Sequence, residues 1–142
     1  MSNEEYEEFD FLSELKKKFP LMYANTFDAW VDKGWQPIIF ELSNKIQSYI
    51  DRSLKKNDLD KVVPQIQVAQ IKEKFGGLRF YYDGGDSTVD AMVSMAESWA
   101  DHTCEICGAS GKSRNLPWVK TLCESHYKEK LQYYKDRMLI KD

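Results

Sequence analysis

Three cysteines and one histidine are the residues of this chain best suited to chemistry, because their spacing is that of metal ligands. Cys104 and Cys107 form a C-x-x-C pair, and Cys123 and His126 form a C-x-x-H pair after a gap of fifteen residues. The second pair can fold back onto the first and close a tetrahedral Cys3His site, with Zn–S distances of about 2.3 Å and Zn–N distances of about 2.0–2.1 Å. The sequence therefore predicts one bound Zn²⁺ ion.

This ligand set indicates a structural metal rather than a catalytic one. All three cysteines of the chain are used, so a disulfide would leave one thiol unpaired. Four protein ligands leave no open position for water or substrate, and we expect the zinc to stabilise the fold. One alternative is a redox C-x-x-C motif. Another is ligation by His102, although His102 lies two residues before Cys104 and is better explained as a helix-end residue.

A second group of candidate residues lies in the segment QIQVAQIKEKFGGLRFYYDGGD, which has the pattern of a β-hairpin with Gly76–Gly77 at its turn. With this turn, Phe75 lies opposite Leu78 and Lys74 lies opposite Arg79. The hairpin then has one apolar face, which we expect to join the core. The members of that face are Ile71, Phe75, Leu78, Phe80 and Tyr82, with Glu73 as its only charged residue.

The opposite face of the hairpin is the predicted ligand surface. Like charges opposed across an antiparallel pair destabilise it by ~0.2–1 kcal/mol, so the Lys74–Arg79 pair needs acidic residues from another element or an anionic ligand. The candidate ligand residues are Lys72, Lys74, Arg79 and Tyr81. A solvated face is the alternative. An enzyme with Glu73 as its carboxylate is a further alternative, but no acid and base pair defines a reaction.

The charge is unevenly distributed along the chain. The net charge is −3, yet residues 108–142 carry eight bases and four acids, which is +4 and leaves −7 for the rest. A basic zinc lobe suggests nucleic-acid binding as an alternative function. A solvated helix face accounts for Lys128, Lys130 and Lys135 equally well.

The elements that must position these residues begin with helices. Apolar residues recur at helical spacing in FDFLSELKKKFP, which ends at Pro20, and a longer helix begins at Pro37. Between them we expect a second short helix around Thr26–Lys33, with Trp30 and Trp35 packed in the core at the junction.

The segment after the hairpin is expected to turn into another helix. Its glycine pair is flanked by aspartates, which favours a plain strand-to-helix turn over a phosphate-binding loop. Ser87 followed by Asp90 matches a capping box at the start of that helix. The C-x-x-H pair begins a last helical pattern, as in a treble-clef arrangement.

Length and composition agree with one compact unit. With 142 residues, 42% of them hydrophobic, the chain can bury a real core. The predicted fold class is α+β: N-terminal helices, a β-hairpin, a long helix, and a Cys3His zinc knuckle with a C-terminal helix. We expect residues 1–10 to be an acidic, flexible N-terminus and residues 11–142 to form a single zinc-stabilised domain.

The same data bear on location. The acidic N-terminus does not match a signal peptide, and no apolar run approaches the ~20 residues of a membrane-spanning helix. Thiolates kept for a metal indicate a reducing compartment, so we expect a cytoplasmic protein without membrane contact.

The motifs KEKFGGLRFYYDGGD, CEIC and CESH together resemble a family of uncharacterised small zinc-binding proteins of bacteria and their phages, over roughly Gly34–His126. In that family a K-E-K-F-G-x-L-R-F-Y hairpin precedes C-x-x-C and C-x-x-H pairs. The resemblance implies a microbial or viral protein, in the host cytoplasm if viral, and transfers no catalytic residue. We therefore expect a binding protein rather than an enzyme, acting on an anionic small molecule or a protein partner, with interference in a host system as one role.

Overall fold

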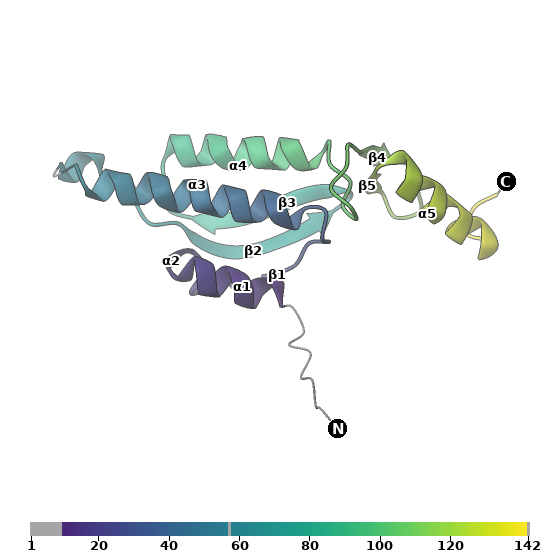
Figure 1. Cartoon of the computed structure of the whole chain (residues 1–142), viewed down its shortest axis with the longest axis horizontal. Coiled ribbons are helices and arrows are strands. Elements are labelled where there is room, and N and C mark those ends of the chain that lie inside the picture. The colour runs from purple at the N-terminus through teal and green to yellow at the C-terminus, as the bar shows by residue number, and fades with distance from the viewer. Residues whose placement is uncertain (1–9, 57, 142) are drawn as a thin grey trace, which may run out of the picture.

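The computed structural model describes residues 10–56 and 58–141, so the predicted flexible N-terminus lies, except for Asp10, outside the described residues. The described part is a mixed α+β structure, as predicted (Figure 1). Its α-helices are α1 (Phe11–Lys18), α2 (Pro20–Tyr23), α3 (Gln36–Leu54), α4 (Ser87–Ala100) and α5 (Glu124–Asp136). Its strands are β1 (Asp28–Ala29), β2 (Gln67–Lys74), β3 (Gly77–Asp83), β4 (Lys112–Arg114) and β5 (Lys120–Leu122), and a 3₁₀ turn spans Leu59–Lys61.

The chain divides into two regions, which we call the body (residues 10–101) and the cysteine lobe (residues 102–141). The body holds a three-stranded sheet of order β1-β2-β3, in which β1 is parallel and β3 antiparallel to β2. The cysteine lobe holds the β4-β5 hairpin and α5, and it lies at one end of the body (Figure 1). Each region has its own cluster of buried apolar residues.

Helices cover one face of the body sheet. Helix α4 contacts α3 and β3, while α1 and α2 contact β1 and β2. On the covered face Ile71, Leu78 and Phe80 are buried, whereas Arg79 and Tyr81 on the other face are exposed. We call this second face the open face. No helix of the described part is both long and apolar enough to cross a lipid bilayer.

The segment predicted as a short helix at Thr26–Lys33 contains strand β1 instead. The Thr26 hydroxyl donates to Val68 O at 2.6 Å, and the Trp30 N–H donates to Ile71 O at 3.1 Å, so this segment pairs with β2. Burial alternates along it, as in a half-covered strand. The prediction for Trp30 was also wrong: its side chain is 54% exposed, while Trp35 is buried as expected.

The hairpin forms, but its turn lies one residue earlier than predicted, so each β3 residue pairs with a β2 residue two positions earlier. Lys74 pairs with Gly77, so the turn residues are Phe75 and Gly76, with φ of 53° and 77°. Such a two-residue turn needs positive φ at both positions, which Gly76 adopts without strain. Phe75 is 76% exposed and not part of the core. Lys72, not Lys74, therefore lies opposite Arg79.

Helix α4 also begins slightly earlier than its capping pattern suggested. Its N-cap is Asp86, one residue before the predicted Ser87, and the Asp86 carboxylate accepts a hydrogen bond from Val89 N at 3.0 Å. The second carboxylate oxygen accepts one from the Tyr49 hydroxyl at 2.6 Å. The Tyr49 contact ties the start of α4 to α3. The glycine turn before it is then a plain connection from β3 to α4.

Candidate metal centre and ligand surface

The four predicted metal ligands meet at one point of the cysteine lobe. The ligand atoms of Cys104, Cys107, Cys123 and His126 all lie within 4.8 Å of one another. The Cys107 and Cys123 sulfurs are 3.8 Å apart, and His126 Nδ1 is 3.6 Å from the Cys104 sulfur. Ligands at the corners of a tetrahedron around an ion with metal–sulfur bonds of about 2.3 Å would be about 3.6–3.8 Å apart. The Cys123 sulfur lies closer to His126 Nδ1, at 3.2 Å, and the proximity of the four groups is compatible with a bound metal ion.

Local structure explains why these side chains converge. The first pair lies in a tight loop, closed by hydrogen bonds from Gly108 N to Cys104 O at 3.0 Å and from Cys104 N to Ala109 O at 2.7 Å. The β4-β5 hairpin then returns the chain to this loop. Cys123 is the N-cap of α5, which places His126 one turn along the helix. His102 is not in the group, since its ring contacts Ser98 O at 3.0 Å.

The backbone around the first pair favours a thiolate. Burial acts to raise the pKa of Cys104, but hydrogen bonds from the backbone N–H groups of Cys123, Cys107 and Ile106 together outweigh it and lower that pKa to about 7. A thiolate is the form that binds metal ions. None of the three cysteines is in a disulfide. The donor set and its surroundings are therefore suited to a soft or borderline metal ion.

The cysteine lobe is fixed to the body by backbone contacts at its metal-ligand loop. Gly34 N donates to Glu105 O at 2.8 Å, and the indole N–H of Trp35 donates to Thr103 O at 2.8 Å. A Cβ atom on Gly34 would lie 2.0 Å from Cys104 O, so only glycine fits at this junction. The metal site and the body core are therefore mechanically connected.

A buried charge cluster makes the second connection. Glu105, only 2% exposed, accepts from Thr121 N at 2.6 Å and lies 3.6 Å from the ammonium of Lys120. Lys120 also lies 3.6 Å from Glu73, whose other oxygen accepts from Gly76 N at 2.6 Å. Burial raises the pKa of Glu105. Burial acts to lower the pKa of the Lys120 ammonium, but the charges of Glu105, Glu73 and Asp32 together outweigh it and raise that pKa. We call Glu73, Glu105 and Lys120 the junction cluster.

The junction cluster changes the interpretation of the K-E-K-F-G-G motif. The Thr121 hydroxyl donates to Gly76 O at 2.7 Å, so the hairpin turn itself is part of the contact with the lobe. The Glu73 carboxylate, which was considered as a catalytic group, already pairs with Lys120 and accepts a hydrogen bond from Gly76 N in the turn. Glu73 and the turn residue Gly76 of this motif therefore stabilise the fold.

The predicted ligand residues are only partly brought together. Lys72, Arg79 and Tyr81 lie on the open face, with the Lys72 ammonium 5.7 Å from the centre of the Tyr81 ring. Lys74 is exposed at the end of β2, and its ammonium lies 5.9 Å from the ring centre of Phe75. Lys72, Arg79 and Tyr81 therefore form a patch, while Lys74 lies at its edge.

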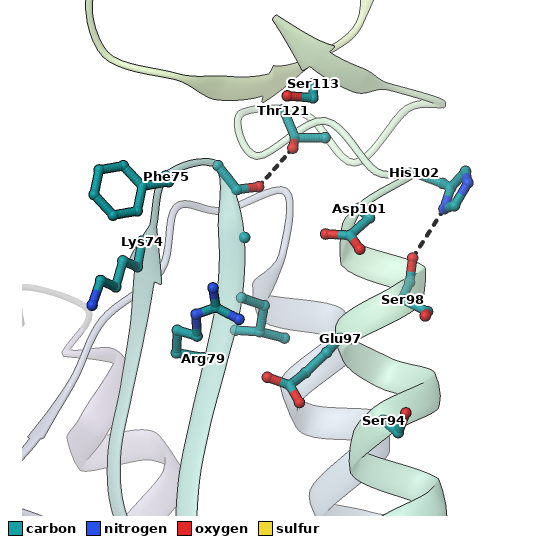
Figure 2. Close-up of a pocket in the computed structure, with 13 residues that line it drawn as sticks. Lys74, Phe75, Arg79, Ser94, Glu97, Ser98, Asp101, His102, Ser113 and Thr121 are labelled. Atoms are coloured by element: carbon teal, nitrogen blue, oxygen red, sulfur yellow. Dashed lines mark hydrogen bonds between the residues drawn. The ribbon is translucent and has the colours of Figure 1, made fainter.

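A polar groove of about 620 Å³ lies between the hairpin, the C-terminal half of α4 and the cysteine lobe (Figure 2). Arg79 reaches this groove from β3, and Glu97 and Asp101 reach it from α4. Burial raises the pKa of Glu97, while the N–H of Phe80 and the charge of Arg79 oppose that shift. Glu97 is thus an acidic residue from another element that offsets part of the charge of Arg79, which is one of the two arrangements expected for this arginine.

A smaller cavity of about 280 Å³ lies along β1 and β2, next to the cysteine lobe. Its walls include Trp30, Lys72 and the junction cluster, together with Asp28 and Asp32. Trp30, Glu105 and Lys120 were not predicted as residues of a site. The run Asp28–Asp32 has three apolar residues in succession, so it does not mark Trp30 as outward, and no local signal joins Glu105 to Lys120.

Comparison of the chain with models of protein families, with curated proteins and with solved structures finds no match.

Proposed function

We propose that the protein is a small zinc-stabilised binding protein whose open face takes an anionic ligand. Zinc is proposed because three thiolates and one imidazole at tetrahedral spacing are its usual structural donor set. A C-x-x-C loop, a hairpin and a ligand-bearing helix N-terminus also follow the order of a treble-clef arrangement. Binding is proposed rather than catalysis, since four protein ligands leave the metal no open position and Glu73 is already paired.

The observation that carries the ligand proposal is the cationic pair on the open face. Lys72 and Arg79 are directly opposed across β2 and β3, and within the described residues neither forms an ion pair. Glu97 offsets the charge of Arg79 through space, but Lys72 has only the face of the Tyr81 ring. An anion between the two side chains would relieve their repulsion and gain charge-assisted hydrogen bonds.

Titration calorimetry with inorganic pyrophosphate tests this proposal. We expect the wild-type protein to bind pyrophosphate and the double variant Lys72→Gln with Arg79→Gln to lose binding by at least about 10-fold. Lys45→Gln with Arg52→Gln is the matched control, because it removes the same charges from α3 and should leave binding unchanged. Equal binding by the wild-type protein and the Lys72/Arg79 variant would refute the ligand site.

Nucleic-acid binding by the cysteine lobe is the second candidate, and aromatic residues next to bases favour it. Trp118 is 65% exposed and stacks on Tyr134 with ring centres 6.2 Å apart. Arg137 lies 3.6 Å from the ring centre of Tyr133. Neutralising four phosphates would make the logarithm of affinity fall by about 3–4 per decade of salt, and a shallow slope would argue against this candidate.

A further inference from the structure

Trp30 is an aromatic side chain held at the surface by the strand that carries it. It follows β1, between the buried residues Ala29 and Val31, so the alternation of the strand directs its ring to the open face. The backbone N–H of Trp30 donates a hydrogen bond to Ile71 O at 3.1 Å, which limits rotation of this segment. A rigid, exposed indole at the rim of a cavity is a suitable surface for stacking a flat ring.

Trp30, Lys72 and Arg79 occupy neighbouring positions across the three strands of the sheet. Ala29 pairs with Ile71, which puts Trp30 beside Lys72, and Lys72 pairs with Arg79 on the next strand. Neighbouring strands are about 4.8 Å apart, so the backbone positions of Lys72 and Arg79 lie roughly one and two strand spacings from that of Trp30. That separation is comparable to the distance between the base and the phosphate of a single nucleotide.

The chemistry of the cavity rim adds a preference for the base. Asp28 and Asp32 are exposed, lie two residues before and after Trp30, and line the same cavity of about 280 Å³. Asp28 has a 3.4 Å hydrogen bond from Gln70, while the Asp32 carboxylate accepts none in the described structure. Carboxylates bind donors, and guanine has two adjacent N–H donors on its pairing edge where adenine has one amino group.

The charge of the body favours a compact ligand over a long strand. The chain without residues 108–142 carries −7, from −3 for the whole minus +4 for that segment. A strand crossing the open face would pass Asp28 and Asp83, both exposed, well within the Debye length of about 10 Å at 0.1 M salt. A mononucleotide has its one anionic group at Lys72 and Arg79 and avoids this repulsion.

We propose that the open face binds a nucleoside phosphate, preferably a guanosine phosphate, with its base stacked on Trp30 and its phosphate between Lys72 and Arg79. This inference rests on the proposed function and names the ligand class of the same anion site. Lys72 is the main phosphate contact, because Arg79 is shared with Glu97. Asp32, whose charge also acts on Lys120, is the acceptor beside the base.

Titration calorimetry on the metal-loaded full chain tests the inference with guanosine monophosphate, adenosine monophosphate and inorganic phosphate. We expect guanosine monophosphate to bind at least about 10-fold more tightly than phosphate, since stacking of one base contributes about 1–3 kcal/mol, or about 5–150-fold in affinity. Trp30→Ala should remove this gain and leave phosphate binding unchanged. Lys72→Gln should weaken both ligands, and Asp32→Asn should reduce the preference for guanine over adenine.

Control variants make each outcome decisive. Trp118→Ala removes the exposed indole of the cysteine lobe and should not change nucleotide binding. Trp30→Phe keeps a stacking ring, and it should retain part of the gain if Trp30→Ala fails to fold. Equal affinity of the wild-type protein for guanosine monophosphate and phosphate, or full nucleotide binding by Trp30→Ala, would overturn the inference.

The outcomes also separate this inference from the proposed function. Binding of pyrophosphate that depends on Lys72 and Arg79, without any gain from a base, keeps the anion site and rejects the nucleotide. Tighter binding of a single-stranded 12-mer than of the mononucleotide, with a steep salt dependence, rejects the compact ligand in favour of a strand. Binding of none of these probes rejects both the anion site and the nucleotide.

Discussion

The junction cluster and the open face both include residues of the β2-β3 hairpin, but their cations differ in whether they form ion pairs. At the junction, Lys120 lies 3.6 Å from each of two carboxylates, and one of these, Glu105, is almost fully buried. On the open face, Lys72 and Arg79 oppose each other without an ion pair in the described part of the chain. Paired charges at the junction serve the fold, while unpaired charges on the surface are available to a ligand. One K-E-K-F-G-G-L-R motif thus contributes Glu73 to the junction cluster and Lys72 and Arg79 to the proposed ligand surface.

Removal of the metal should have the largest effect on stability, and this effect should concern the cysteine lobe and its junction rather than the open face. The apolar core cluster of the described lobe has four buried residues, Cys104 among them, so we expect metal binding to supply much of the folding free energy of the lobe. We expect one zinc ion per chain by elemental analysis and loss of a folded lobe in Cys107→Ser. Structural zinc contributes about 10–16 kcal/mol in small isolated sites, which sets the upper scale.

The exposed Met138→Ala variant of the same lobe is the control for this prediction and should keep both metal and stability. Substoichiometric metal in freshly purified protein, together with a melting temperature that chelation does not change, would contradict it. Such a result would mean that the metal does not stabilise the junction side of the comparison.

Breaking the junction cluster should have the next largest effect. Glu105→Ala leaves the half-buried Lys120 with one carboxylate and Thr121 N without its acceptor, and removing one partner of a buried pair costs about 3–5 kcal/mol. Urea denaturation of both proteins measures this difference. Glu41→Ala, which breaks the exposed pair with Lys45, is the control, with an expected cost below about 0.5 kcal/mol. Equal costs for the two variants would show that the junction is no more than a surface contact.

The pH dependence of stability should differ at the junction by a smaller amount. Because burial raises the pKa of Glu105, the folded state favours the protonated carboxyl. The contribution of this group is therefore full below its unfolded pKa and declines as pH rises through the raised folded value. Glu105→Gln should remove this decline, so the wild-type protein should lose stability relative to the variant as the pH rises above about 4.5. A constant difference in unfolding free energy across that range would argue against the raised pKa.

The metal ligands could be predicted from the sequence because their signal is local. Each pair is three residues apart, and the chain offers no surplus cysteine, so spacing alone selects Cys104, Cys107, Cys123 and His126. The α+β class and the start of α3 near Pro37 were predicted for the same reason: periodicity and proline act within a few residues.

The hairpin register and the junction could not be predicted, since contacts distant in sequence decide them. Both Gly76–Gly77 and Phe75-Gly76 are compatible with a tight turn. The second is selected where Glu73 accepts from Gly76 N and the Thr121 hydroxyl donates to Gly76 O, and Thr121 lies 45 residues further along the chain. The short strand containing Asp28 is likewise formed by pairing with β2, which no local helix pattern reveals.

The smallest expected effect on stability is at Arg79, and it sharpens the comparison most. Arg79 is exposed and forms no ion pair in the described structure, so Arg79→Ala should change the unfolding free energy by no more than about 0.5 kcal/mol. Arg114 is the matched arginine of the cysteine lobe. It is buried, donates to Leu122 O at 3.1 Å and lies 3.3 Å from Glu124.

Loss of the Arg114 contacts should cost about 2 kcal/mol or more, because a buried carbonyl loses its donor and Tyr127 loses the stacked guanidinium. Urea denaturation of Arg79→Ala and Arg114→Ala, combined with pyrophosphate titration of both, measures stability and binding together. We expect Arg79→Ala to bind several-fold more weakly at unchanged stability and Arg114→Ala to show the reverse. If Arg79→Ala is destabilised as much as Arg114→Ala, Arg79 belongs to the fold through Glu97, and the open face has one free cation instead of two.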